Sequence, residues 1–270
     1  MADLELKASN KLLKTEIMNI TDINVSILPS TSETLQDHVY LVTGAAGAVG
    51  GAIAVALGVS GATAILVDRN SRGLDATYDQ ITEAGGAEPI KLELDLLSTS
   101  LPQYEEMADL IKTEFGRLDG IIHCAVEPGT LTPLSQYPMD LLNKALLVNL
   151  SAPYMLTQCC LDLLREAENA CVIFTSAEVA RQGKAYWGAY SISGFAMESL
   201  AQIWADELET NTNIRINTLD TGPVSSLLRA RIFPGEDPAT VPTADSVVPA
   251  YIYLLTSDVN GAIARVTGNE

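Results

Sequence analysis

A long uncharged segment in the first quarter of the chain constrains the fold most strongly. Residues 39–67 carry no charged side chain, which is enough length to cross a membrane, but they contain six glycines. The segment divides into an apolar strand, a glycine turn, a helix and a second apolar strand. This pattern predicts a buried β-α-β unit rather than a membrane span.

The same alternation of apolar strands with helices of about ten or more residues continues along the chain. Strands are predicted over residues 38–44, 62–68, 89–95, 120–126, 171–177 and 214–220. Helices are predicted between them, over residues 51–60, 72–84, 102–115, 139–166 and a segment that holds Tyr190 and ends near Glu209. Strands joined in this way predict an α/β fold with one doubly wound parallel sheet of the Rossmann type and six core strands.

The chain divides into a short extension and one domain. Residues 1–36 mix acidic, hydroxyl and isolated apolar side chains, and we expect an N-terminal extension that is partly disordered, with a helix near residues 12–20. Residues 37–270 then form a single Rossmann-type dinucleotide-binding domain. The first residues, MADLELKASNKLL, lack the apolar core of an export signal, and we expect a cytoplasmic protein.

Charge and cysteine usage exclude several classes of function. Sixteen basic residues stand against 34 acidic ones, for a formal net charge of −18. Such an acidic surface repels nucleic acid and anionic lipid, so we expect neither as a partner. The four cysteines show no metal-ligand spacing, and we expect reduced thiols and no metal site.

The glycine turn TGAAGAVG predicts a nucleotide site. Gly44, Gly47 and Gly50 leave room for a pyrophosphate to approach the backbone N–H groups at the start of a helix, and Val49 lies in the same turn. A glycine pattern alone is weak, but here it follows a strand and opens a helix. The alternative is that these glycines serve only helix–strand packing.

Acidic residues at the ends of the next two strands extend this site. Asp68 ends the second strand, where its carboxylate accepts hydrogen bonds from a ribose and repels a 2′-phosphate. This favours NAD over NADP, although Arg69 and Arg72 lie close by and weaken the preference. Asp95 and Leu96 follow the third strand, where Asp95 is placed to accept from an adenine amine.

With these residues in view, the chain from residue 37 to the end resembles the short-chain dehydrogenase/reductases. Within that family it looks most like the bacterial YciK-type oxidoreductases, on the segments GRLDGIIHCA, YMLTQ, VIFTSAEVARQGKAYWGAY and FPGEDP. The resemblance implies hydride exchange between a nicotinamide and a carbonyl or alcohol. It also implies a homodimer or homotetramer formed through the helices around Asn149 and Tyr190.

The family's catalytic residues are only half present. The resemblance implies that Tyr190 is the acid/base and that Asn149 holds a proton-relay water, but Ala177 and Gly194 stand where the family has its serine and lysine. Further departures are Ala48 in the glycine turn, Cys124 to Val126 for Asn-Ala-Gly, and Thr221-Gly222 for Pro-Gly. The chain also stops at RVTGNE, so we expect the family's seventh strand to be truncated.

The missing lysine is the larger loss. A phenol has a pKa of about 10, and lowering it to about 7 requires roughly 4 kcal/mol, for which a nearby cation is the usual source. One hypothesis is therefore an NAD(H)-binding protein with impaired or no catalysis. The other is an active NAD(P)-dependent oxidoreductase that uses Tyr190 with a substitute cation, Lys184 or Arg181. A third possibility is a homo-oligomeric scaffold that binds no cofactor.

Several polar residues near the predicted site have a simpler interpretation. Lys184 and Arg181 are expected first as solvated surface charges. His123 lies in an apolar strand and is expected as a core histidine. The family's substrate loop corresponds to residues 222–238, in which Arg229 and Arg231 either meet an acidic substrate or, as we expect first, lie on the surface.

Overall fold

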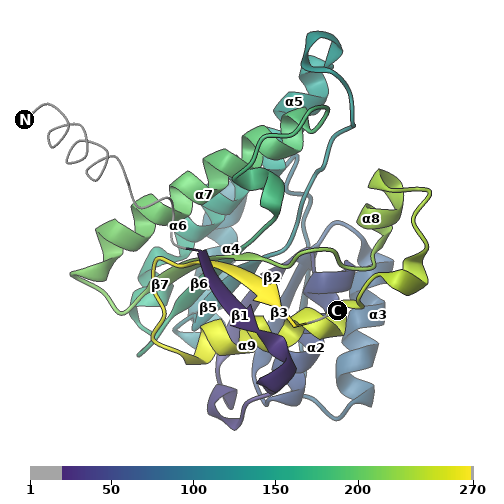
Figure 1. Ribbon diagram of the computed structural model, residues 1–270. Coiled ribbons are helices and arrows are strands. Elements are labelled where there is room, and N and C mark those ends of the chain that lie inside the picture. Colours follow the sequence, from purple (N-terminus) through teal and green to yellow (C-terminus); the bar gives the residue numbers. More distant parts are fainter. Residues whose placement is uncertain (1–19, 269–270) are drawn as a thin grey trace, which may run out of the picture.

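The structure is a computed structural model, and it describes residues 20–268. Over these residues one sheet of eight strands forms, in the order β1-β8-β7-β6-β5-β2-β3-β4 (Figure 1). All of its strand pairs are parallel. The strands are β1 (Ile20–Asn24), β2 (Val39–Thr43), β3 (Thr63–Asp68), β4 (Ile90–Glu93), β5 (Gly120–His123), β6 (Cys171–Ser176), β7 (Arg215–Asp220) and β8 (Ile263–Thr267).

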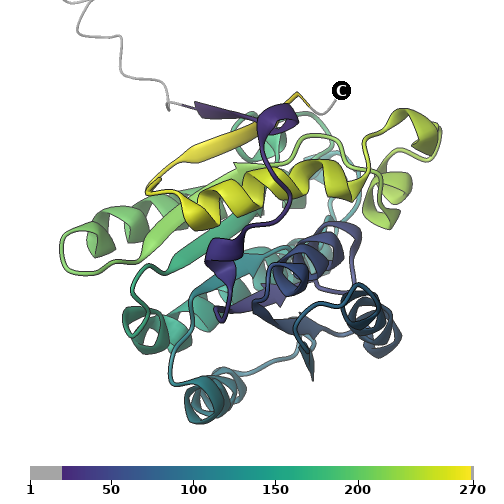
Figure 2. The same cartoon turned by 90° about the horizontal axis from the view of Figure 1, so that it is seen from below.

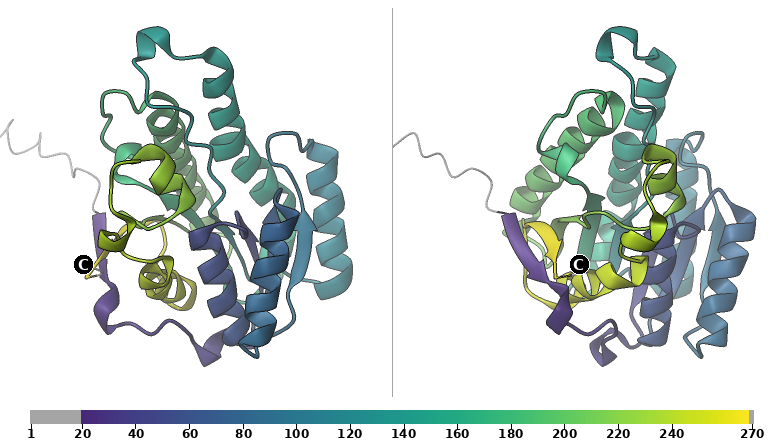
Figure 3. Two further views of the ribbon diagram at one scale, coloured as in Figure 1. Left: turned by 90° about the vertical axis from the view of Figure 1, so that its right-hand side faces the viewer. Right: turned by 45° about the vertical axis from the view of Figure 1, so that its right-hand side comes forward.

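Helices cover both faces of the sheet, as the view from below makes plain (Figure 2). One core cluster joins the sheet to α2 (Ala48–Val59), α3 (Ser71–Glu83) and α9 (Val248–Thr256). The other joins it to α4 (Leu101–Phe115), α6 (Ala152–Arg165) and α7 (Gly188–Glu209). Two further helices, α5 (Met139–Leu146) and α8 (Leu227–Ile232), project beyond the sheet (Figure 3). The α/β doubly wound fold is therefore confirmed.

The sheet is wider than the sequence indicated. The six expected core strands are β2 to β7, but the seventh strand, expected to be truncated, is present as the five-residue β8. An eighth strand comes from the N-terminal extension, since β1 pairs residue for residue with β8, from Ile20 with Ile263 to Asn24 with Thr267. Two expectations for the N-terminal extension, partial disorder within residues 1–36 and a helix near residues 12–20, fall mainly on residues 1–19, which lie outside the described part. Ile20 already begins β1.

One predicted helix is interrupted in a way that matters for the site. The segment predicted as a helix over residues 139–166 is α5 followed by a π-helical turn, Leu147–Ser151, and then α6. A π turn widens the helix and re-aims the side chains it carries. Asn149 lies in this turn and is buried.

Two negative findings apply to residues 20–268 alone. No helix there combines the length and apolar character that a membrane crossing requires. Nor does that part of the chain bring three or more histidine, cysteine or acidic side chains together in a group that could hold a metal ion.

Candidate functional site

A cleft of about 1440 Å³ opens at the carboxyl ends of β5 to β8. Five of the predicted site residues line it: Val49, Asn149, Ala177, Tyr190 and Gly194. The remaining ones lie at the carboxyl ends of the neighbouring strands β2 to β4, in the turns that follow, or in the first turn of α2: Gly44, Gly47, Gly50, Asp68, Asp95 and Leu96. In parallel α/β sheets, this edge is where ligands bind.

The glycine turn between β2 and α2 has the shape that a pyrophosphate needs. Gly44 has a φ of +69°, and a Cβ atom there would lie 2.7 Å from the backbone nitrogen of Ala125. A Cβ atom at Gly50 would overlap the Gly44 carbonyl oxygen. Since α2 begins at Ala48, its first N–H groups have no acceptor within the helix and open onto this turn. These residues fit a dinucleotide phosphate group.

Asp68 and Asp95 are fixed beside the turn by backbone hydrogen bonds. The Asp68 carboxylate accepts from the N–H of Ala46 at 3.2 Å and of Asn70 at 3.0 Å. Asp95 accepts from the N–H of Leu97 at 3.1 Å and lies 4.0 Å from the Arg69 guanidinium. Both carboxylates are thus held near the ends of their strands.

Tyr190 lies in the first turn of α7 and lines the cleft. Burial, and after it the negative charge of Asp220, raise the pKa of Tyr190 to about 12. An acid/base phenol needs the opposite shift, toward neutral pH.

Gly194 replaces the family's lysine, and a neighbouring segment packs closely against it. Gly194 lies one turn after Tyr190 on α7, where it packs against the short 3-10 helix Glu178–Ala180. A Cβ atom at Gly194 would lie 2.8 Å from the Ala180 Cβ and 3.1 Å from its Cα. Any side chain at this position must therefore displace the segment that follows β6.

Asn149 is committed to structural hydrogen bonds. Its Oδ1 accepts from the N–H of Glu127 at 2.7 Å, and its Nδ2 donates to the Glu127 carbonyl and to Ser193 Oγ, both at 2.9 Å. Both amide hydrogens are therefore used. Through these hydrogen bonds Asn149 connects the loop after β5 to α7, which is a structural role.

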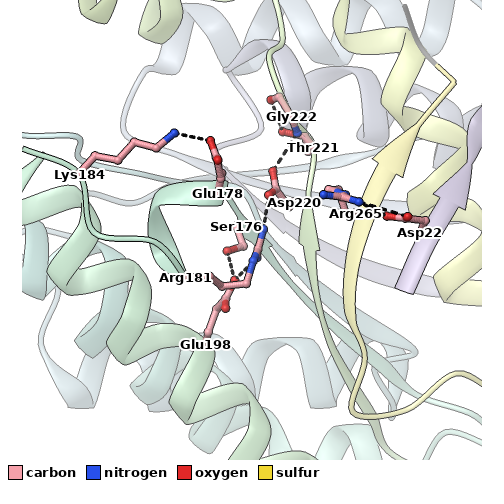
Figure 4. A network of polar contacts seen from close by, with 10 residues as sticks. All are labelled: Asp22, Ser176, Glu178, Arg181, Lys184, Glu198, Asp220, Thr221, Gly222 and Arg265. Carbon is pink, nitrogen blue, oxygen red and sulfur yellow. Dashed lines mark hydrogen bonds and ion pairs between the residues drawn. The ribbon is translucent and has the colours of Figure 1, made fainter. Parts of the chain in front are cut away.

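Arg181, Glu198 and Asp220 form a buried ion-pair cluster (Figure 4). Arg181 pairs with Glu198 on α7 at 2.5 Å and with Asp220 at the end of β7, and Ser176 donates to Glu198 at 2.5 Å. The Arg181 side chain is only 8% exposed. The expectation that Arg181 is a solvated surface charge is therefore wrong, because two carboxylates from distant elements receive it. Lys184 is a half-exposed side chain paired with Glu178 at 2.5 Å, as expected for a surface charge.

This cluster sets the electrostatics of the site. One cation faces two carboxylates, so the group carries a net negative charge when all three are ionised. Burial raises the pKa of Glu198, while Ser176 and Arg181 act in the opposite direction. Sequence reasoning missed Glu198, although its position eight residues after Tyr190 places it on the same helix face.

His123 is a neutral core residue, as predicted. Its Nε2 lies 2.9 Å from Thr157 Oγ1, and its ring stacks on Phe174 with centroids 4.8 Å apart. Burial lowers the pKa of His123 to about 3. The four cysteines are all free, in agreement with reduced thiols.

The fold and the glycine turn together define an α/β protein of the Rossmann type. The model of the family described as short chain dehydrogenase matches residues 38–237. The oxidoreductase YciK of Escherichia coli K12, whose activity is uncharacterised, is 36% identical over 226 residues, which is 84% of this chain and 89% of that protein. The chain belongs to the short-chain dehydrogenase/reductase family.

Solved structures agree with this assignment. A Pseudomonas syringae structure assigned to the short chain dehydrogenases has a TM-score of 0.86 and 39% identity, covering 88% of this chain and 98% of that one. A Shigella flexneri structure complexed with NADP has a TM-score of 0.83 and 33% identity, covering 88% of this chain and 100% of that one. The family identification thus stands on sequence and on structure.

Proposed function

We propose that the chain binds a nicotinamide dinucleotide and that its hydride-transfer chemistry is impaired or lost. The observation that carries this proposal is the packing at Gly194, where the Cβ of any larger residue, such as the family's lysine, would lie 2.8 Å from the Ala180 Cβ. The glycine turn, by contrast, keeps the geometry that a pyrophosphate needs. A bound nicotinamide would supply the hydride donor or acceptor for a carbonyl or alcohol.

The electrostatics around Tyr190 support the impairment. Burial and Asp220 raise the pKa of its phenol, so the phenolate is scarce at neutral pH. Ala177 in addition removes the hydroxyl that contacts developing negative charge, a loss worth about a hundredfold to a thousandfold in rate. The loss of the family's lysine and the loss of its serine act on one site, so their effects on the rate need not add.

The second candidate is an active oxidoreductase with a rebuilt site, which is supported by the position of Tyr190 in the cleft. It needs a substitute cation. Lys184 is held by Glu178, and Arg181 donates to two carboxylates, so neither is available to stabilise a phenolate. An ordinary enzymatic turnover rate with any carbonyl substrate would contradict the proposed impairment and favour this second candidate.

A titration of the protein with NADH, followed by nicotinamide fluorescence, tests the binding part. We expect saturable binding through the proposed cofactor residues Gly44, Gly47, Val49, Gly50, Asp68, Asp95 and Leu96. If millimolar NADH and NADPH both fail to bind, the chain is a scaffold of this fold rather than a dinucleotide-binding protein.

Asp68 is proposed to favour NAD(H) over NADP(H), although the Shigella flexneri relative was crystallised with NADP. Replacing Asp68 by Asn keeps the side-chain shape and removes the charge that repels a 2′-phosphate. We expect the ratio of the NADPH and NADH dissociation constants to fall by about tenfold. Parallel fluorescence titrations measure it, with Asp95→Asn as the control that leaves the ratio unchanged. An unchanged ratio in Asp68→Asn would contradict the assignment.

Gly194→Lys restores the family residue and is expected to fail as a repair. The new side chain overlaps Ala180, so the free energy of unfolding should fall by about 1–3 kcal/mol without a gain in turnover. Urea denaturation and a carbonyl-reduction assay measure the two effects. The double variant Ala180→Gly with Gly194→Lys is the control, and it should recover part of the lost stability. A single variant as stable as the wild type and active would refute the packing argument.

The remaining assignments are also proposals. We propose a cytoplasmic homodimer or homotetramer with residues 37–270 as its dinucleotide-binding domain. Large apolar side chains are exposed on the π turn and on α7, which supports association through these helices: Leu147, Ile192, Phe195 and Ile203.

A further inference from the structure

The basic side chains that line the cleft are all engaged by carboxylates. They come from the segment after β6, from α8 and from β8. Over residues 20–268 the four pairs are Arg181 with Glu198 and Asp220, Lys184 with Glu178 at 2.5 Å, Arg229 with Glu236 at 2.6 Å, and Arg265 with Asp22 at 2.8 Å. Within that range the cleft therefore presents no unpaired cation to a ligand.

The four cations and the five carboxylates that pair with them leave a net charge of −1 when all are ionised. Glu178 and Asp220 line the cleft themselves, and His123 is neutral because burial lowers its pKa to about 3. A carboxylate or phosphate placed at the substrate end loses its hydration without gaining a counter-charge, which is costly. Arg231, the other arginine expected to meet an acidic substrate, does not line the cleft and instead donates to the Gly129 carbonyl at 3.3 Å.

An aromatic wall lies at the same end of the cleft. Trp187, just before α7, has its ring centroid 6.0 Å from that of Tyr190 and 5.9 Å from that of Phe233, just after α8. Arg229 lies over the Phe233 ring, 4.3 Å from its centroid, while Glu236 holds its guanidinium in place. The ring of Phe233 is thus fixed, and apolar side chains continue the wall: Val224, Leu228, Ile232 and Val241.

We infer that the substrate end of the cleft binds a neutral, flat aromatic ketone or alcohol that stacks on Trp187 and Phe233. Over residues 20–268 every cation that lines the cleft is paired, which disfavours acidic ligands, and the tilted rings offer the faces and edges that an aromatic partner prefers. The inference deepens the proposed function, because it names the ligand class of the same cleft. It does not require turnover, since a site that has lost its chemistry still binds.

Isothermal titration calorimetry with two isosteric probes tests this inference. The neutral probe is 2-acetylnaphthalene, and 2-naphthoate replaces its methyl group by a charged oxygen. We expect the neutral probe to bind with a dissociation constant at least about tenfold lower than that of the carboxylate. Equal affinities, or tighter binding of the carboxylate, would overturn the inference.

Matched variants locate the binding. Trp187→Ala should weaken binding of 2-acetylnaphthalene by about tenfold, while Trp187→Phe should retain most of it. Tyr253→Ala is the control, because Tyr253 is a partly exposed aromatic residue on α9 that does not line the cleft. If Trp187→Ala fails to fold, Trp187→Leu takes its place. Weakening by the Tyr253 variant, or no effect at Trp187, would contradict the assignment.

An NADH titration of the same preparation separates this inference from the proposed function. Binding of NADH without binding of 2-acetylnaphthalene overturns only the ligand class. Binding of the ketone without binding of NADH supports the aromatic site and overturns the dinucleotide proposal.

Discussion

Replacement of Arg181 by methionine is expected to lower the free energy of unfolding by about 3–5 kcal/mol at pH 7. Methionine fills much of the same volume but leaves Glu198 and Asp220 as two uncompensated buried charges, and removing one partner of a buried pair has a cost of this size. Urea denaturation measures it. A loss of less than about 1 kcal/mol would mean that water reaches these carboxylates.

The pH dependence of this variant distinguishes charge from packing. Without the guanidinium, burial holds the pKa of the Glu198 carboxyl above that of the unfolded chain, so the folded state takes up a proton as the pH falls. The deficit of Arg181→Met relative to the wild type should therefore be largest at pH 8. It should shrink as the pH falls toward about 4, the range in which unfolded carboxyl groups titrate. A deficit that does not change with pH would indicate lost packing alone.

A second control removes the charges together. The triple variant Arg181→Met, Glu198→Gln, Asp220→Asn leaves no buried ion, and we expect it to be more stable at pH 7 than Arg181→Met alone. The two singly neutralised variants, which leave Arg181 with one carboxylate, should fall between them.

Gly50→Ala is expected to weaken NADH binding by about ten- to several hundredfold. The new methyl group overlaps the Gly44 carbonyl oxygen, so the turn must open and one or two hydrogen bonds to the pyrophosphate are lost. Hydrogen bonds to charged groups contribute about 1.5–3 kcal/mol each. Nicotinamide fluorescence measures the affinity, and urea denaturation measures the accompanying loss of stability.

Gly183→Ala is the matched control for this second prediction. A Cβ atom at Gly183 meets nothing within 4 Å, and its backbone is not in the left-handed region. The substitution should leave NADH affinity within about twofold of the wild type, since open surface changes have small effects. Equal affinities in all three proteins would show that the glycine turn does not hold the dinucleotide.

The core of the fold is predictable because its pattern is local. The strands from β2 to β7 are apolar runs separated by helices, and the glycine turn marks where the first strand meets its helix. The edge strand β1 is five residues long and pairs with β8, about 240 positions away in the sequence, as the pairing of Asp22 with Arg265 illustrates. The local sequence pattern of so short a segment does not predict a strand that forms by pairing with such a distant partner.

In the candidate site, too, some features can be predicted from the sequence and others cannot. Tyr190, Asn149 and the two substituted positions follow from motif spacing. The burial of Arg181 does not, because its partners lie 17 and 39 residues away on different elements. The filling of the lysine position by Ala180 is likewise a packing contact between segments, which spacing along one helix does not reveal.

The pairing of β1 with β8 also determines how the molecule bears load. These strands lie near the two ends of the described chain and run parallel, in register from Ile20 with Ile263 to Asn24 with Thr267. A force that draws the two ends apart pulls the strands in opposite directions along their length. The hydrogen bonds between them are then strained together rather than one after another, and the Asp22–Arg265 bridge is strained with them. The strand that widens the sheet is thus also a shear clamp that resists extension from the termini.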